Sequence, residues 1–192
     1  GSSAGYAIIV QGKILPSEEG LDSHKKTTDR IYNHLRKRDF ASQNIFYFTY
    51  APLQGEGVLS EIPSKSGIQY AIETWVKEKM NNVPSPLYII LVDHGNPQTF
   101  YIGSETITPD DLSLWLDNLD GGLNAQAIEE KKVIVIGSCY SGSFIAPLSQ
   151  SKNNRIVITS AAADEESYKG PKESDNIRSG EFFLEEFFLN LS

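Results

Sequence analysis

The only cysteine of the chain, Cys139, lies where an apolar run meets a group of small residues. Residues 133–136 are all β-branched, and an apolar run without polar alternation is typical of a buried strand. Glycine and serine residues surround the thiol and leave it little covered: Gly137, Ser138, Ser141, Gly142 and Ser143. A second apolar run, residues 87–92, leads into Asp93-His94-Gly95. If the two runs are neighbouring strands, an imidazole and a thiol meet at one sheet edge, where open α/β sheets bind their ligands.

A histidine beside a cysteine supplies the chemistry of nucleophilic catalysis. The imidazole takes the thiol proton, and the thiolate attacks a carbonyl carbon. Cys139 is therefore the candidate nucleophile and His94 the candidate general base. The backbone N–H groups of Gly95 and Cys139 could bind the oxyanion that forms in acyl transfer. Of the other histidines, His34 falls within a charged helical stretch and is expected on the surface, while His24 begins that stretch.

Other roles for a single cysteine can be compared with its neighbours. A redox pair needs a cysteine at position 142, which is Gly142, and a phosphatase loop needs arginine at position 145, which is Ile145. A hydrolase elbow needs glycine where the chain has Ser141. A buried structural thiol stays the alternative, and the His-Gly pair on the second apolar run favours catalysis. One cysteine also excludes an internal disulfide framework and a cysteine-based zinc site.

Five strands and five helices are expected to position these residues. The strands are expected at residues 6–10, 45–50, 87–93, 133–137 and 155–160. The helices are expected at residues 22–38, 66–80, from 109 to the Gly121-Gly122 pair, from 141 or 143 onward, and 180–191. A hairpin is expected at 99–102 and 106–107, and loops at 13–22, 51–66 and 161–180.

Apolar spacing and capping residues support two of these helices. In the second helix, apolar residues recur at helical spacing: Ile68, Ile72, Trp75, Val76 and Met80. Ser64 or Ser66 is its expected N-cap. For the next helix, Thr108 is the expected N-cap, because Pro109 and two acidic residues follow it.

The alternation of strands and helices predicts an α/β fold with a mostly parallel, doubly wound sheet covered on both faces. Residues 6–192 are long enough for one domain with a full core, and residues 1–5 read as a cloning remnant or a domain edge. The net charge of −8 argues against nucleic acid or an anionic membrane as partner. No apolar run approaches the length of a membrane span, so no transmembrane segment is expected.

The apolar blocks that end in Asp93-His94-Gly95 and in Ser138-Cys139 resemble the caspase-like superfamily of cysteine peptidases, clan CD. Within it, Ser-Cys-Tyr-Ser-Gly-Ser at 138–143 is most similar to the legumain family, whose motif reads Ala-Cys-Glu-Ser-Gly-Ser. Residues 158–168 and 179–183 resemble the blocks that follow the cysteine in that family. The resemblance covers nearly the whole chain, and it is closer to bacterial legumain-like domains than to the eukaryotic enzyme.

The resemblance implies a caspase-like three-layer α/β/α sandwich and hydrolysis of peptide bonds through a thioester acyl-enzyme, without a cofactor or a metal. It makes Cys139 the nucleophile and His94 the general base and acid. The strand 156–162 is expected to present Ser160 and Ala161 along the substrate backbone, which would bind as an added strand. Bacterial relatives often belong to larger surface proteins, so flanking domains and a secreted or cell-envelope location are expected.

The specificity pocket departs from the family at Tyr140, where legumains have an acid. The acid that does match is Glu181, and His24 aligns loosely with a basic pocket residue. A lone buried carboxylate favours a cation, so Lys or Arg is expected at P1, the residue before the cut, or failing that Asn. The alternative for Glu181 is a first-turn helix acid that faces water. Asp93 either orients His94 or closes the strand. The substrate-binding candidates are thus Glu181, Ser160, Ala161, Tyr140, His24 and Asp93.

Relatives are often activated by self-cleavage, which is expected here in the loop 168–180, above all after Arg178. Two other functions stay open. A transamidase or peptide ligase would pass the same acyl group to an amine. A catalytically silent module would serve as a binding domain of a larger protein, but the presence of both His94 and Cys139 argues against it.

Overall fold

The computed structural model describes residues 3–14, 21–93, 95–96, 99–137, 144, 147–148 and 154–159. The strands are β1 (Tyr6–Gln11), β2 (Lys13–Ile14), β3 (Ile45–Phe48), β4 (Leu59–Glu61), β5 (Leu87–Val92), β6 (Gly95–Asn96), β7 (Thr99–Gly103), β8 (Glu105–Ile107), β9 (Lys132–Gly137) and β10 (Arg155–Thr159). The helices are α1 (Leu21–Lys37), α2 (Lys65–Tyr70), the π-helix η2 (Ala71–Trp75), α3 (Val76–Asn82), α4 (Pro109–Gly122) and the short 3-10 helices η1 (Ser42–Asn44) and η3 (Ala127–Glu129).

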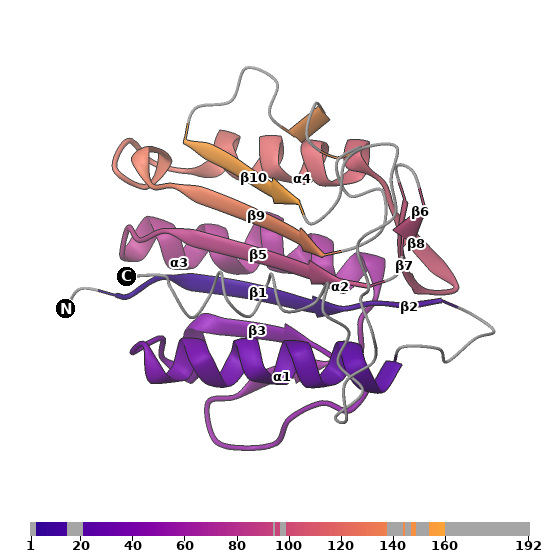
Figure 1. Ribbon diagram of the computed structural model, residues 1–192. Helices are drawn as coiled ribbons and strands as arrows, with labels where there is room; N and C mark the ends of the chain where they lie inside the picture. The colour runs from indigo at the N-terminus through magenta and orange to yellow at the C-terminus, as the bar shows by residue number, and fades with distance from the viewer. Residues whose placement is uncertain are drawn as a thin grey trace.

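Six strands form the main sheet in the order β10-β9-β5-β1-β3-β4, and all of its pairings are parallel. Figure 1 shows β10, β9, β5, β1 and β3 side by side with their arrowheads at the same end. All six residues of β1 are buried, which explains why its first five, 6–10, are apolar without alternation. The predicted α/β fold with a mostly parallel sheet is thereby confirmed.

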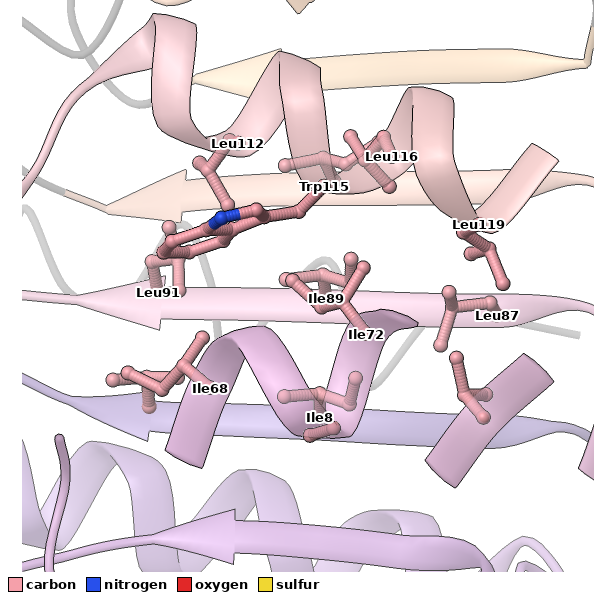
Figure 2. Packing of buried hydrophobic residues seen from close by; sticks show 14 of the residues in the cluster. Ile8, Ile68, Ile72, Leu87, Ile89, Leu91, Leu112, Trp115, Leu116 and Leu119 are labelled. Carbon is pink, nitrogen blue, oxygen red and sulfur yellow. The ribbon is translucent and has the colours of Figure 1, made fainter. Parts of the chain in front are cut away.

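Helices cover both faces of this sheet. Ile31, Tyr32 and Leu35 of α1 pack on one face, and α2, η2, α3 and α4 pack on the other (Figure 1). Figure 2 shows side chains of these helices over the strands, among them Ile68, Ile72, Leu112, Trp115, Leu116 and Leu119 above Ile8, Leu87, Ile89 and Leu91. Each fully buried aliphatic side chain contributes about 1.5–3 kcal/mol to the stability of the fold. Packing on both faces therefore holds the strands of the sheet in place.

The predicted helix 66–80 contains a π-helical stretch, Ala71–Trp75, between α2 and α3. Besides Ala71, four residues of this segment are wholly buried, and these four are spaced by four: Ile68, Ile72, Val76 and Met80. In an α-helix of 3.6 residues per turn, a spacing of four drifts around the axis by about 40° at each step. The wider π turn removes part of that drift, so all four side chains face the sheet.

The predicted caps are present. The Ser64 hydroxyl accepts a hydrogen bond from the Gly67 N–H at 3.0 Å, which identifies Ser64 rather than Ser66 as the N-cap of α2. Thr108 caps α4 in a capping box with Asp111, and Pro109 occupies the first turn. Both helices therefore begin where their sequences indicate.

A small second sheet, β2-β7-β6 with β8 beside β7, follows the carboxyl end of β5. The predicted hairpin is its β7–β8 pair, in which Phe100 lies opposite Ile107. Two expected loops contain short strands, β2 within 13–22 and β4 within 51–66. Strands of two or three residues carry too few side chains to show a sequence period, so these loop predictions were wrong at those positions. The expected helices after Ser141 and over 180–191 fall wholly or mainly outside the described residues.

Candidate functional site at the carboxyl edge of the sheet

The two strands that carry the candidate motifs are neighbours. β5 pairs with β9 in parallel, and Val92, the last residue of β5, lies opposite Gly137, the last residue of β9. The backbone N–H of Asp93 donates to the Gly137 carbonyl at 3.1 Å, which extends the pairing one residue beyond β5. Adjacent strands lie about 4.8 Å apart. The chain therefore leaves the sheet at one level on two neighbouring strands, immediately before His94 and two residues before Cys139.

The structure describes three of the predicted site residues: His24, Asp93 and the backbone of Gly95. Both residues of the predicted catalytic pair, Cys139 and His94, lie outside the described residues, so their roles stay predictions. The same holds for the other substrate-binding candidates, Tyr140, Ser160, Ala161 and Glu181. β10, which leads into Ser160, pairs with β9 and is the outermost described strand on that side of the sheet.

Gly95 belongs to β6, where it pairs antiparallel with Phe100 of β7. The chain thus passes from β5 into the small sheet within a few residues. β2, which follows β1 directly, pairs in parallel with the far end of β7, at Ile102 and Gly103. The small sheet is therefore connected to both β1 and β5 at the carboxyl edge. Its pairing with Gly95 limits the paths that the backbone can take after β5.

Asp93 lies over the end of β1. Its side chain is only 1% exposed, and its Oδ1 lies 3.8 Å from Nδ1 of His24, whose side chain is 6% exposed. Gly12, the residue after β1, lies directly against it: a Cβ added at Gly12 would come within 2.2 Å of the Asp93 Cβ. Because no side chain stands at position 12, the carboxylate can occupy this place.

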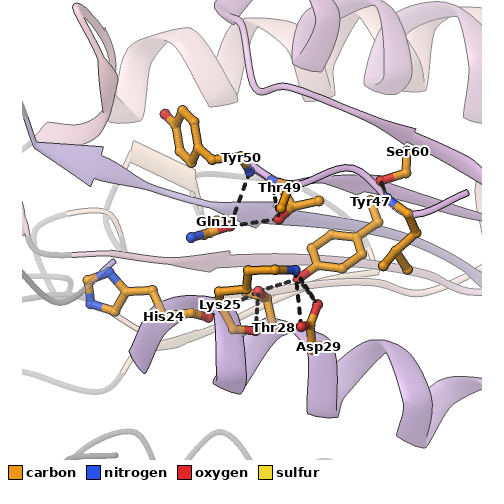
Figure 3. Close-up of polar contacts among 11 residues, drawn as sticks. Gln11, His24, Lys25, Thr28, Asp29, Tyr47, Thr49, Tyr50 and Ser60 are labelled. Carbon is orange, nitrogen blue, oxygen red and sulfur yellow. Dashed lines mark hydrogen bonds and ion pairs between the residues drawn. The ribbon is translucent and has the colours of Figure 1, made fainter. Parts of the chain in front are cut away.

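A polar network ties the ends of β1 and β3 together (Figure 3). Gln11 is completely buried, and its Oε1 accepts from the Thr49 hydroxyl at 2.7 Å and from the Tyr50 N–H at 3.2 Å. Figure 3 shows the Tyr50 and His24 side chains on opposite sides of Gln11. The two aromatic residues thus lie on the two sides of the sheet at this edge.

Tyr50 carries a buried hydroxyl with no hydrogen-bond partner among the described residues. Burial, followed by the negative charges of Asp93 and Glu105, raises the pKa of Tyr50 to about 12. The hydroxyl therefore stays protonated at neutral pH. The ammonium of Lys13 lies 5.5 Å from the centre of the Tyr50 ring, a cation–π contact at the same edge.

Three of these edge residues were not predicted from the sequence: Gln11, Gly12 and Tyr50. The only signal was the Gln-Gly pair that ends an otherwise apolar strand. A buried amide needs hydrogen-bond partners, so a glutamine at the end of a buried strand indicates a polar network. Glutamine and glycine at these positions do not by themselves show which residues the network holds in place.

Among the described residues, no group of three or more His, Cys, Asp or Glu side chains could hold a metal ion. Likewise, none of the helices in the described ranges is long and apolar enough to cross a membrane.

Comparisons with known proteins bear on both fold and site. The sequence profile of the Peptidase C13 family matches residues 76–191, more than half of the chain. The fold is similar to that of caspase-1 from Spodoptera frugiperda, with a TM-score of 0.63 and 14% sequence identity over 98% of this chain and 68% of the caspase chain. No curated protein matches the sequence. The structural similarity confirms the predicted caspase-like α/β/α sandwich.

Proposed function

We propose that this chain, which belongs to the Peptidase C13 family, is an endopeptidase in which His94 activates Cys139. The family is one of cysteine peptidases of clan CD, in agreement with the legumain-like motif in the sequence. The observation that carries the proposal is the pairing of Val92 with Gly137. Because of this pairing, the strands that lead to His94 and Cys139 are neighbours and end at the same level of the sheet.

In the proposed reaction, His94 takes the proton of the Cys139 thiol, and the thiolate attacks the carbonyl carbon of the scissile peptide bond. The N–H groups of Gly95 and Cys139 stabilise the oxyanion of the tetrahedral intermediate. His94 then gives its proton to the leaving amine, and a thioester forms on Cys139. Water, deprotonated by His94, hydrolyses the thioester and releases the acid.

For the substrate we propose a peptide that lies along β10 and continues past Ser160 and Ala161, with Lys or Arg at P1, or failing that Asn. Support comes from the position of β10 beside β9 and at the margin of the described sheet, where an added strand can pair. Glu181 is the proposed P1 carboxylate, and Tyr140 the neighbour of the nucleophile in that pocket.

A panel of fluorogenic tetrapeptides that differ only at P1 tests this function. We expect cleavage after Lys or Arg, or else Asn, and no cleavage by Cys139→Ala or His94→Ala. A clear preference for Asp would contradict the proposed pocket. Product analysis with an added amine nucleophile separates hydrolysis from ligation, because a ligase would give the amide product.

Self-cleavage in the loop 168–180, with Arg178 as the first candidate, is part of the proposal. The expected result is a lower mass for the wild-type protein than for Cys139→Ala, with the difference equal to a fragment cut after Lys169, Lys172 or Arg178. Identical intact masses would count against it.

A further inference from the structure

Asp93 is enclosed by residues from three elements at the point where β5 gives way to His94. Gly12 lies beneath its side chain at the end of β1, and His24 of α1 faces its carboxylate at 3.8 Å. On the other side, its backbone N–H is bonded to Gly137 at the end of β9. Asp93 is therefore held from three directions.

The place of the carboxylate depends on the glycine. The Gly12 N–H donates to the Val92 carbonyl at 2.8 Å, so β1 and β5 stay paired up to this level. A Cβ at position 12 would approach Cγ of Asp93 to 2.3 Å and Oδ2 to 2.6 Å. Those atoms belong to the side chain that would have to move, and its displacement would strain the residue that precedes His94.

His24 is itself held in place. The Thr28 hydroxyl donates to the His24 carbonyl at 3.0 Å, and Asp29 accepts from the Tyr47 hydroxyl of β3 at 2.7 Å. The first turns of α1 are thereby tied to the sheet. His24 is only 5% exposed, so its imidazole faces the protein interior and Asp93 rather than solvent. A side chain in that position is better suited to hold a buried carboxylate than to bind a substrate.

We propose that His24 is a positioning residue: it holds Asp93 over Gly12 and thereby fixes the backbone that leads into His94. A buried carboxylate is stable only with a compensating partner, and His24 supplies one from the opposite element. Through Asp93 it limits the movement of the base relative to Cys139. This inference rests on the proposed function, in which His94 is the base.

The test replaces His24 by Leu, which keeps the bulk but removes the nitrogen atoms, and by Asn, whose side-chain amide lies near the place of Nδ1. His34→Leu is the matched control, because His34 is on the same helix, half-exposed, and bonded to Arg38. Asp93→Asn and the double variant His24→Leu/Asp93→Asn complete a cycle. kcat and KM are measured separately on the P1 panel, per Cys139 thiol labelled by a peptidyl electrophile.

A positioning role predicts that His24→Leu lowers kcat about tenfold, with KM within twofold and P1 preference unchanged, as for loss of a charge-assisted contact. His24→Asn should recover part of the loss, the double variant should be no worse than the poorer single variant, and His34→Leu should match the wild type. If His24→Leu does not fold, His24→Asn and Asp93→Asn decide by the same criteria.

Three results would overturn the proposal. A raised KM or altered P1 preference at normal kcat would make His24 part of the substrate pocket. A lower melting temperature with normal kcat and KM would make its role purely structural. If the wild-type protein neither cleaves the panel nor reacts at Cys139, the proposed function fails and this inference fails with it. If the wild-type protein is active but His24→Leu has no effect on kcat, only this inference fails.

Discussion

Two tyrosines near the end of β3 differ in how their buried hydroxyls are satisfied. The Tyr47 hydroxyl contacts Asp29 and Thr28, whereas the Tyr50 hydroxyl has no hydrogen-bond partner among the described residues. An intramolecular hydrogen bond contributes about 1 kcal/mol, and a buried hydroxyl without one is unfavourable. We therefore expect Tyr47→Phe to lower the free energy of unfolding by about 1 kcal/mol and Tyr50→Phe to leave it unchanged or raise it.

Urea unfolding of the two Tyr→Phe variants checks this pair, because each change removes the same single oxygen. Equal losses of stability in both would contradict the contrast, since they would mean that the Tyr50 hydroxyl is as well bonded as that of Tyr47.

The close approach of Gly12 to Asp93 predicts a large cost for a single methyl group. Gly12→Ala should destabilise the fold by about 1–3 kcal/mol, the range typical of overpacking. Gly121→Ala is the matched control, because no atom lies within 4 Å of a Cβ at Gly121 in α4. In a helix that change should stabilise by about 0.5–1 kcal/mol. Thermal unfolding should therefore show a lower melting temperature for Gly12→Ala and a higher one for Gly121→Ala. An unchanged melting temperature in Gly12→Ala would contradict the close contact between Gly12 and Asp93.

At this scale the sequence suggests a reactive pair but not the residues that surround it. Cys139 and His94 are the candidates because each follows an apolar run and belongs to a known motif. Gly12 and Gln11 matter only through residues that folding brings beside them, and no local pattern encodes that. For His24 the sequence showed a position at the start of a helix, while the structure shows that it faces Asp93.

At the scale of single elements, the helix of residues 65–82 shows what a period can and cannot reveal. Apolar residues at helical spacing predicted a helix there correctly. The strict spacing of four already differed from the 3.6-residue turn, and it accounts for the π-helix Ala71–Trp75. The strands β2 and β4 were missed because they are shorter than any pattern that a sequence can display.

The start of α4 predicts a dependence of stability on pH. Burial favours the neutral form of Asp111, but the Thr108 N–H and Lys65 outweigh it and lower the pKa of this carboxyl. A lowered pKa means that the stabilisation by Asp111 is present above the unfolded-state pKa of about 3.9 and is lost as pH falls through the folded-state value. Asp111→Ala should cost about 1 kcal/mol at pH 7.

Urea unfolding of wild type and Asp111→Ala between pH 3 and 7 provides the measurement. The difference in unfolding free energy should shrink below about pH 4. The exposed Asp110 is in the same turn, so Asp110→Ala serves as control and should change stability less. If the difference in unfolding free energy between wild type and Asp111→Ala grew as pH falls, the pKa of Asp111 would be raised rather than lowered.

At the scale of the whole molecule, a buried ion cluster joins α4 to β9 and β10 at the opposite end of the sheet. Nζ of Lys132, which is completely buried, lies 3.0 Å from Asp120, and Arg155 lies 3.1 Å from the other oxygen of that carboxylate. Asp120→Asn would leave two buried cations undercompensated, and we expect a loss of about 3 kcal/mol. Asp117→Asn, at a more exposed carboxylate 3.5 Å from Arg155, should cost less than about 1 kcal/mol.

Chemical denaturation of both Asp→Asn variants decides the point. If the two lose equal stability, the cluster is not centred on Asp120. This cluster also explains how a lysine can occupy the buried start of β9, a choice that the sequence alone does not justify.

The order of the strands in the sheet could be predicted only in part from the sequence. Apolar runs before His94 and Cys139 predicted two buried strands, but their adjacency was only a condition of the hypothesis. Parallel strands are joined by long crossovers, so order along the chain does not determine order in the sheet. β5 and β9 are neighbours, although β6, β7, β8 and α4 lie between them in the sequence.

The central claim is that this adjacency lets His94 activate the Cys139 thiol. The most direct measurement is the rate at which a peptidyl electrophile labels Cys139 as a function of pH, in the wild-type protein and in His94→Ala. We predict fast labelling near neutral pH in the wild type, and in His94→Ala a much slower reaction that rises only towards the ordinary thiol pKa of about 8.5. Slow labelling with the same pH dependence in both proteins would contradict the claim.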